Sequence, residues 1–188
     1  VQWEAFPDQI IDSTDIEMLK AKRWPTVLTL EEFTKVTKKE AYPEYLKKDL
    51  VDGKLHIFSN GEMNYTIKGK HAKLSVLWDY EAPEDTGDTH YSIMRGTKSD
   101  LIIKQGAAEN FKSVLYIESK GDSDFESNLN LVVANEIAKG FLGTTVEKMG
   151  DSTWKINIPE KFKIGHEAHF AQVTENYLNF LEAGKLPD

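Results

Sequence analysis

Alternation of apolar and polar residues between positions 54 and 105 constrains the fold of this chain most strongly. Every second residue is apolar over much of residues 62–68 and again over residues 71–80. A period of two is typical of strands that pack one face against a core. Asn60-Gly61 favours a type I′ hairpin turn between residues 55–59 and 62–68, and Gly69 allows a second reversal. We therefore predict an antiparallel sheet at the centre of the fold.

More strands extend this sheet. His90–Arg95 and Asp100–Gln105 form a predicted pair that turns at Gly96-Thr97, and Leu115–Glu118 adds a strand. Thr145–Lys148 and Trp154–Ile158 form a last predicted pair around Gly150-Asp151. An earlier strand is expected over Ile16–Ala21, and Trp24-Pro25-Thr26 is expected to interrupt the chain after it.

Short helices are predicted before the central sheet. Thr29 followed by Glu32 matches a capping box, with Phe33 on the apolar side of the helix. Pro43 suits the first position of another helix, over Glu44–Leu50.

Two longer helices follow the sheet. Ser123 and Glu126 form a second candidate capping box, which opens a helix that covers the sheet and ends near Gly143. The last helix is predicted to begin near Gly165 or His166 and to stop at Gly184. Its apolar side carries Phe170, Val173, Tyr177, Leu178 and Leu181. These elements predict an α+β fold, an open and mainly antiparallel sheet with helices on one face.

The composition is that of an ordinary globular protein. The chain has 188 residues, of which 40% are hydrophobic and 29% charged, and we expect one domain over residues 1–188. A net charge of −8 argues against a nucleic-acid surface, which requires clustered Lys and Arg. No apolar stretch is long enough to cross a membrane. The absence of cysteine excludes disulfides and thiolate sites, and it is compatible both with the cytoplasm, which we expect, and with export.

Motifs that hold nucleotides or metals are absent or incomplete. The sequence contains no G-x-G-x-x-G turn, no phosphate loop and no G-x-S-x-G elbow. In His166-Glu167-Ala168-His169 the histidines are three apart instead of four, and no third ligand is evident. Asp122, Asp124 and Glu126 resemble a calcium loop, but Ser127 and Val133 stand where it needs glycine and glutamate. We expect no metal and no cofactor held by this chain alone.

Asp88, His90 and Arg95 are the strongest candidates for chemistry. Asp88 and His90 are two apart, so on a strand they would point to the same side, where a carboxylate can orient an imidazole. Histidine near its ordinary pKa can act as a general acid or base. The alternative is structural, because His and Asp at strand ends commonly satisfy each other or a turn.

Arg23 and Trp24 are a second candidate. A cation beside an indole can receive a sugar or a carboxylate. The alternative is a core tryptophan with an arginine at its rim. Trp3, Trp78 and Trp154 are most simply core or interface residues.

Several segments resemble a known family. They are residues 71–84 and 87–98, Arg23-Trp24-Pro25-Thr26, Asn60-Gly61-Glu62 and His166-Glu167-Ala168-His169-Phe170. Together they are similar to the C-terminal domain of oxidoreductases of the glucose–fructose oxidoreductase and inositol dehydrogenase (Gfo/Idh/MocA) family. The resemblance extends over nearly the whole chain.

The resemblance implies a two-domain enzyme. In that family an N-terminal Rossmann domain binds NAD or NADP and usually carries a catalytic lysine. The C-terminal domain completes the substrate pocket and often forms oligomers through the exposed face of its sheet. Its catalytic residues would precede Val1, so none is assigned to a numbered position here. We expect this chain to be the substrate-side domain, inactive alone, with its own Rossmann domain and a second copy as partners.

Two functions remain open at this point. The first is the substrate-binding and oligomerisation domain of an NAD(P)-dependent oxidoreductase that acts on a sugar, a polyol or a related hydroxy compound. Arg23, Trp24, Asp88, His90 and Arg95 would then face the substrate. The second is a free-standing sheet module for binding or assembly, with tryptophans that stack on carbohydrate.

Overall fold

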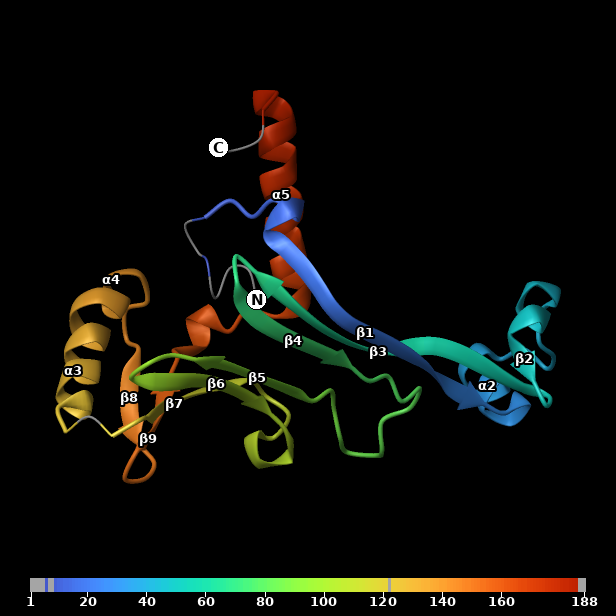
Figure 1. Ribbon diagram of the computed structural model, residues 1–188, viewed down its shortest axis with the longest axis horizontal. Coiled ribbons are helices and arrows are strands. Elements are labelled where there is room, and N and C mark those ends of the chain that lie inside the picture. The colour runs from blue at the N-terminus through green and yellow to red at the C-terminus, as the bar shows by residue number, and fades with distance from the viewer. Residues whose placement is uncertain (1–5, 7–8, 122, 186–188) are drawn as a thin grey trace. The chain divides into compact units, whose positions relative to one another are not determined.

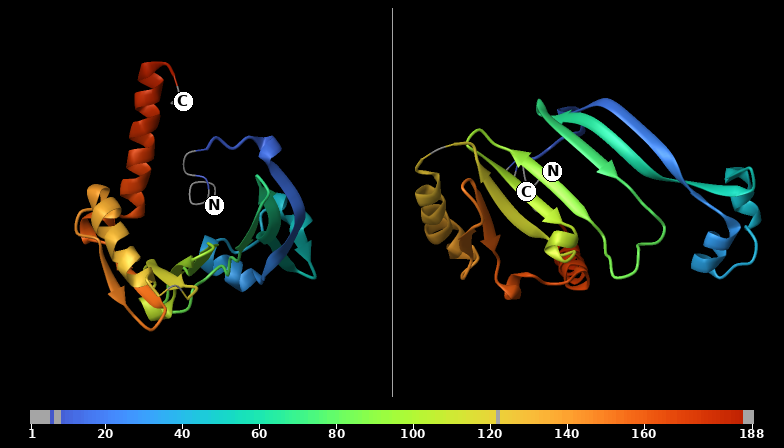
Figure 2. Two further views of the ribbon diagram at one scale, coloured as in Figure 1. Left: turned by 60° about the vertical axis from the view of Figure 1, so that its left-hand side comes forward. Right: turned by 90° about the horizontal axis from the view of Figure 1, so that it is seen from below.

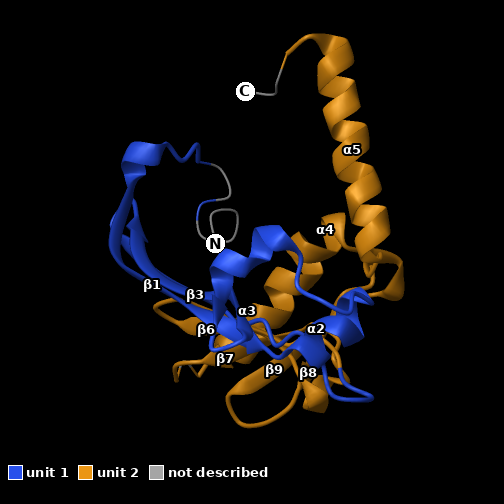
Figure 3. Cartoon of the chain, turned by 90° about the vertical axis from the view of Figure 1, so that its right-hand side faces the viewer, with its two compact units in different colours: residues 1–86 blue, residues 87–188 orange. Residues whose placement is uncertain are grey.

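The computed structural model describes residue 6 and residues 9–121 and 123–185. It contains two antiparallel sheets with helices, so the predicted α+β class is confirmed, although the strands are divided between two sheets instead of one (Figures 1 and 2). The chain separates into two compact units, residues 1–86 and residues 87–188 (Figure 3). We call them unit 1 and unit 2.

Unit 1 is built around one long strand. Its elements in chain order are η1 (Ser13–Asp15), β1 (Ile16–Leu28), α2 (Leu30–Thr37), η2 (Glu44–Asp49), β2 (Leu50–Val51), β3 (Lys54–Ile67) and β4 (Lys70–Val76). Strand β3 pairs with β1, β2 and β4, all antiparallel. The tight turns on either side of β3 lie at Asp52-Gly53 and Lys68-Gly69, where all four residues have positive φ. The reversal predicted at Gly69 is confirmed.

The hairpin predicted at Asn60-Gly61 is wrong, because β3 runs straight through both residues. Asn60 is only 7% exposed. Its side-chain Nδ2 donates to Thr26 Oγ1 over 2.9 Å, and its Oδ1 accepts from the backbone N of Trp78 over 2.7 Å. Gly61 lies opposite Arg23 and Val76 in the sheet. These bonds hold Asn60 within the ladder, and they outweigh the preference of Asn-Gly for a turn.

The interruption predicted at Trp24-Pro25-Thr26 is also wrong. Strand β1 continues to Leu28, and its register with β3 shifts between Trp24 and Thr26. Because proline has no backbone N–H, it is tolerated in an edge strand, and among the described strands β1 pairs only with β3, which carries one extra residue opposite Pro25. The strand predicted over residues 71–80 is shorter than expected, because β4 ends at Val76 and so excludes Trp78 and Tyr80.

The two faces of this sheet differ in chemistry. Residues directly opposite one another point to the same side. Met18 thus joins Tyr65, while Met63 pairs with both Ala21 and Leu74. The other side carries Glu62 between Lys22 and Lys73, with ion-pair distances of 3.6 and 3.1 Å. The apolar side is only partly covered within unit 1, since Met18 is 53% exposed.

A small core lies at one end of this sheet. Leu28, Phe33 and Leu55 are buried together, and Tyr42 packs on them. The predicted capping box is confirmed, because Thr29 Oγ1 accepts from the Glu32 backbone N and the Glu32 carboxylate accepts from the Thr29 backbone N. Hydrogen bonds from Thr29 hold the pKa of Glu32 below its ordinary value. The helix predicted over Glu44–Leu50 is the 3-10 helix η2.

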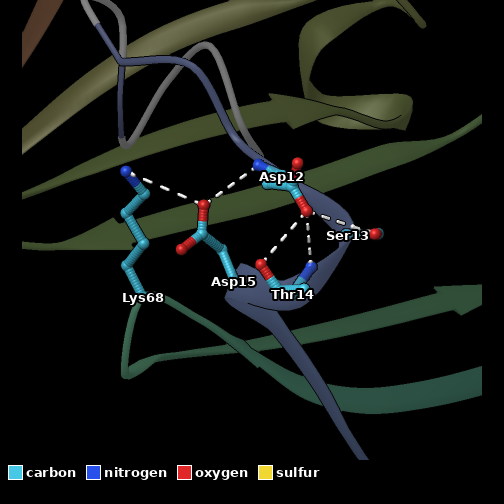
Figure 4. A network of polar contacts seen from close by, with 5 residues as sticks. All are labelled: Asp12, Ser13, Thr14, Asp15 and Lys68. Carbon is cyan, nitrogen blue, oxygen red and sulfur yellow. Dashed lines mark hydrogen bonds and ion pairs between the residues drawn. The ribbon is translucent and has the colours of Figure 1, made fainter.

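The opposite end of the sheet is held by a polar network (Figure 4). Asp12 caps η1 by accepting from the backbone N of Thr14 over 3.0 Å, and its own backbone N donates to Asp15. The Asp15 carboxylate lies 3.8 Å from Lys68 Nζ, and the Asp15 carbonyl accepts from the Lys68 backbone N. The network therefore ties the start of β1 to the turn between β3 and β4.

Unit 2 contains a five-stranded sheet of order β5-β6-β7-β9-β8, antiparallel throughout. Its strands are β5 (His90–Arg95), β6 (Ser99–Gln105), β7 (Val114–Ser119), β8 (Thr145–Lys148) and β9 (Thr153–Asn157). Its helices are η3 (Ala107–Glu109), α3 (Phe125–Val132), the π-helical η4 (Val133–Ile137), α4 (Ala138–Gly140), η5 (Glu160–Phe162) and α5 (His166–Ala183). The predicted strand pairs of this half are confirmed.

A helical run covers one face of this sheet. Val133, Trp154 and Ile156 are buried, and the Phe125 ring lies 5.2 Å from that of Trp154. Helix α3 and its continuation through α4 form the covering helix predicted here, with Asp124 as N-cap instead of Ser123. The last helix is confirmed as α5, which ends at Gly184 with a φ of 67°. Within the described part of the chain, no helix has the length and apolarity needed to span a membrane.

Candidate functional site

The structure distributes the five candidate residues over both units. Arg23 and Trp24 lie on β1 of unit 1. Asp88, His90 and Arg95 belong to unit 2. Each unit therefore presents its own candidate surface.

In unit 1, cations pair with aromatic rings near the centre of β1. The Arg23 guanidinium lies 4.9 Å from the centre of the Phe58 ring, and Lys22 Nζ lies 5.2 Å from the centre of the Trp24 ring. Phe58 is 54% exposed and Trp24 is partly buried. Such pairs can stack against a sugar ring or attract a carboxylate. Arg23 thus lies against Phe58, and the cation beside the Trp24 indole is Lys22.

In unit 2, Gln105 connects three segments at the end of the sheet. It lies opposite His90, the first residue of β5. Its side-chain Nε2 donates to the backbone O of Asp88 over 2.9 Å, and its Oε1 accepts from Ser113 Oγ over 2.6 Å. We call Asp88, His90, Gln105 and Ser113 the strand-end cluster. Asp88 and His90 are exposed, so both side chains are accessible to a ligand.

The predicted relation between Asp88 and His90 does not follow from the strand. Strand β5 begins at His90, so the alternation of side chains does not extend back to Asp88. Both residues belong to the described part of the chain, and no hydrogen bond joins their side chains there. The structure brings the two together through the backbone and Gln105.

The loop between β6 and β7 completes this end of the sheet. Glu109 accepts from the Gly106 backbone N over 3.1 Å and from the Tyr116 hydroxyl over 3.3 Å. Burial, followed by the nearby Glu109, raises the pKa of Tyr116, which keeps the phenol neutral as a donor. Asn110 and Phe111 both have positive φ, at 53° and 56°. For a residue as bulky as phenylalanine this is a strained backbone, a feature that concentrates at functional sites.

Close packing holds that strained loop in place. Gly87 passes so near that a Cβ on it would lie 3.3 Å from the Phe111 Cβ. Four residues at this end of the sheet were not predicted from the sequence: Gln105, Glu109, Ser113 and Tyr116. One signal was present, because Gly106 followed by Glu109 has capping-box spacing. The hydrogen bonds that join Gln105 to Asp88 and Ser113 depend on strand register, so no short sequence motif predicts them.

Arg95 is separated from this cluster. It ends β5, where it pairs with Asp100, while His90 begins the strand. Five residues of strand place them roughly 17 Å apart, and side-chain alternation directs them to opposite faces. Asp100 itself forms an ion pair with Lys120 over 2.7 Å. Arg95 and His90 therefore cannot contact the same small molecule.

The remaining candidates are also located. His166 packs its ring edge-on against Phe170 at 4.7 Å. No group of three or more His, Asp or Glu side chains is positioned to hold a metal ion within the described residues. Asp122 and Trp3 lie outside the described residues. Trp78 is 40% exposed and Trp154 only 4%.

The strand-end cluster supplies groups that recognise hydroxyl compounds. It combines a carboxylate, an imidazole, a primary amide and a hydroxyl, which include both donors and acceptors. An exposed histidine can also accept or donate a proton. These are donor and acceptor groups of the kind that form hydrogen bonds with hydroxyls.

Comparisons with known proteins add the family relationship. The family model described as "Putative oxidoreductase C terminal domain" matches residues 1–188. The chain is also similar to the crystal structure of a "putative oxidoreductase" from Parabacteroides merdae ATCC 43184, with 46% sequence identity and a TM-score of 0.94. That alignment covers 100% of this chain and 44% of the other, so this chain spans less than half of its relative. No curated protein matches the chain.

Proposed function

Because the chain belongs to the family of oxidoreductase C-terminal domains, we propose that it forms the substrate side of an NAD(P)-dependent oxidoreductase in the Gfo/Idh/MocA family. The substrate would be a sugar, a polyol or a related hydroxy compound. The observation that carries this proposal is the match of all 188 residues to a C-terminal domain whose relative is more than twice as long. The sequence has no nucleotide-binding motif, so the dinucleotide belongs to the additional part of such a longer chain.

The strand-end cluster supports a hydroxylated substrate. A bound nicotinamide would supply hydride transfer. On the side of this chain, Gln105 fixes the position of Asp88 and Ser113, while His90 and Asp88 present exposed polar groups. Two substrate hydroxyls could form hydrogen bonds with the Asp88 carboxylate and with the His90 imidazole. The role proposed for these residues is to bind and orient the substrate.

The apolar face of the unit 1 sheet supports self-association, the second part of this proposal. Ile16, Met18 and Val76 are 45%, 53% and 50% exposed. Neighbouring apolar residues on one face of a sheet commonly mark an interface. A second copy of the chain is the occupant we propose for this face.

A free-standing carbohydrate-binding module is the alternative. The observation that favours it is the two cation–aromatic pairs of β1, Arg23 with Phe58 and Lys22 with Trp24. Aromatic faces bind sugars without any redox partner. A catalytic requirement for the strand-end cluster separates the two proposals.

The test uses the longer chain with a panel of hexoses and inositols, and it follows formation of reduced nicotinamide. We expect Asp88→Ala and His90→Ala each to lower kcat/KM by roughly tenfold or more. His71→Ala, another exposed histidine, is the matched control and should leave kcat/KM unchanged. Unchanged turnover in both cluster variants would contradict the assignment, as would a chain that reduces no nicotinamide with any substrate of the panel.

A further inference from the structure

Helix α5 presents an apolar stripe that its own unit leaves uncovered. Phe170, Val173, Tyr177, Leu178 and Leu181 expose between 54% and 64% of their surface. Phe180 is the one apolar residue of the stripe that is partly buried. The helix extends away from the strands of unit 2 (Figure 3). We call these six residues the α5 stripe.

The stripe is too wide for a simple pairing of two helices. At about 100° per residue, its six side chains spread over an arc of roughly 160°. A seam between two helices uses a narrower stripe of first and fourth heptad positions. The α5 stripe is as wide as the apolar side of a helix that packs on a broad apolar surface.

The exposed area distinguishes the possible occupants. The five exposed side chains leave on the order of 500 Å² of apolar surface. Two copies joined through α5 alone would bury about 1,000 Å² in total, less than the roughly 1,200–2,000 Å² of stable complexes between separate proteins. Contacts between domains of one chain hold with about 600–1,500 Å², because the linker keeps the partners near each other.

We propose that the α5 stripe docks on the additional domain of the same longer chain. The inference rests on the proposed function, which assigns a dinucleotide-binding domain to that part. The length of the relative supports it, because this chain covers only 44% of that protein and so leaves ample chain to supply the surface. The expected surface is apolar and broad. Acidic groups at the rim of that surface would be repelled, because α5 itself carries Glu167, Glu175 and Glu182 and no Lys or Arg.

A photo-crosslinking experiment tests the docking. A photoreactive phenylalanine analogue replaces Tyr177 in the stripe or, as matched control, Asn179 on the opposite side of the helix, both in the longer chain. We expect the probe at Tyr177 to form crosslinks at least about tenfold more efficiently than the probe at Asn179. The crosslinked residues should lie outside 1–188. Mixing isotopically heavy and light protein shows whether a crosslink joins two copies. We expect every crosslink to join residues of one copy.

Other outcomes would overturn the docking. Capture confined to residues 1–188, capture between heavy and light copies, or equal capture from both probe positions each contradicts it. A parallel titration with NAD and NADP separates this inference from the proposed function. Dinucleotide binding without capture from Tyr177 refutes only the docking, and capture without dinucleotide binding refutes the proposed function and leaves the docking contact standing.

Discussion

The sheets of the two units use the same strand alternation but are covered differently. In unit 2, α3 and its continuation pack on the sheet and bury Val133 and Trp154. In unit 1, α2 and η2 cover only the end at Leu28 and Leu55, and the remaining apolar face stays largely exposed. The long strand β3 is instead held by polar contacts, those of Asn60 at its centre and those of Asp15 at its end.

This difference indicates how each unit obtains its stability. Burial of large apolar groups dominates where a helix covers the sheet. Where no helix covers it, a few buried hydrogen bonds fix the register, and the apolar face is free for a partner. Substitutions in the two units should therefore differ in their effects on stability.

Removal of the main side chain of the unit 2 core should have the largest effect. Trp154→Ala should lower the free energy of unfolding by about 3–5 kcal/mol, because Trp154 is 4% exposed and packs on Phe125. On the uncovered face, Val76→Ala removes a smaller side chain and should cost about 1 kcal/mol, since Val76 is 50% exposed. Urea unfolding followed by circular dichroism measures both. A loss from Val76→Ala as large as that from Trp154→Ala would contradict an uncovered face in unit 1.

The polar anchor of unit 1 should rank next. Asn60→Ala should cost about 1–3 kcal/mol, because it leaves the Trp78 backbone N and Thr26 Oγ1 without the Asn60 amide. Asn64→Ala, on the same strand but half-buried, serves as control and should change the stability little. Hydrogen exchange of the Trp78 amide should quicken only in the Asn60 variant. An unaltered Trp78 exchange rate would refute the anchoring role.

The smallest predicted effect is electrostatic. Lys73, together with Lys22, lowers the pKa of Glu62 below its ordinary value of 4.5. The stabilisation from Glu62 is therefore present above pH 4.5 and is lost as the pH falls through the lowered pKa. Glu62→Gln should flatten the acid side of the stability profile, whereas Glu17→Gln, on the same polar face, should not. Identical profiles for the wild type and Glu62→Gln would show that this pair contributes nothing.

Much of the fold follows from local sequence patterns. Alternation predicted the strand pairs of unit 2, and a 3.6-residue period predicted α5 with its boundaries. The Thr29–Glu32 spacing predicted the cap of α2. Each of these signals lies within a few neighbouring residues, so no distant contact is needed to read it.

The errors arise where distant contacts decide. Asn60-Gly61 has the composition of a turn, but bonds to Thr26 and Trp78 keep it in a strand. The spacing of Asp88 and His90 suggested a pair on one strand, although β5 begins only at His90. Gln105 was missed because its role depends on register and on a contact to Ser113 across a loop. A pattern of neighbouring residues cannot predict contacts with residues that are distant in the sequence.

Titration of NAD and NADP tests the central claim most directly, namely that this chain forms the substrate side of the enzyme and leaves the dinucleotide to the rest of a longer chain. Isothermal titration calorimetry compares the 188-residue chain with the longer chain under the same conditions. We expect the longer chain to bind with micromolar affinity and residues 1–188 to give no binding heat. Micromolar binding of either dinucleotide to the 188-residue chain alone would contradict it.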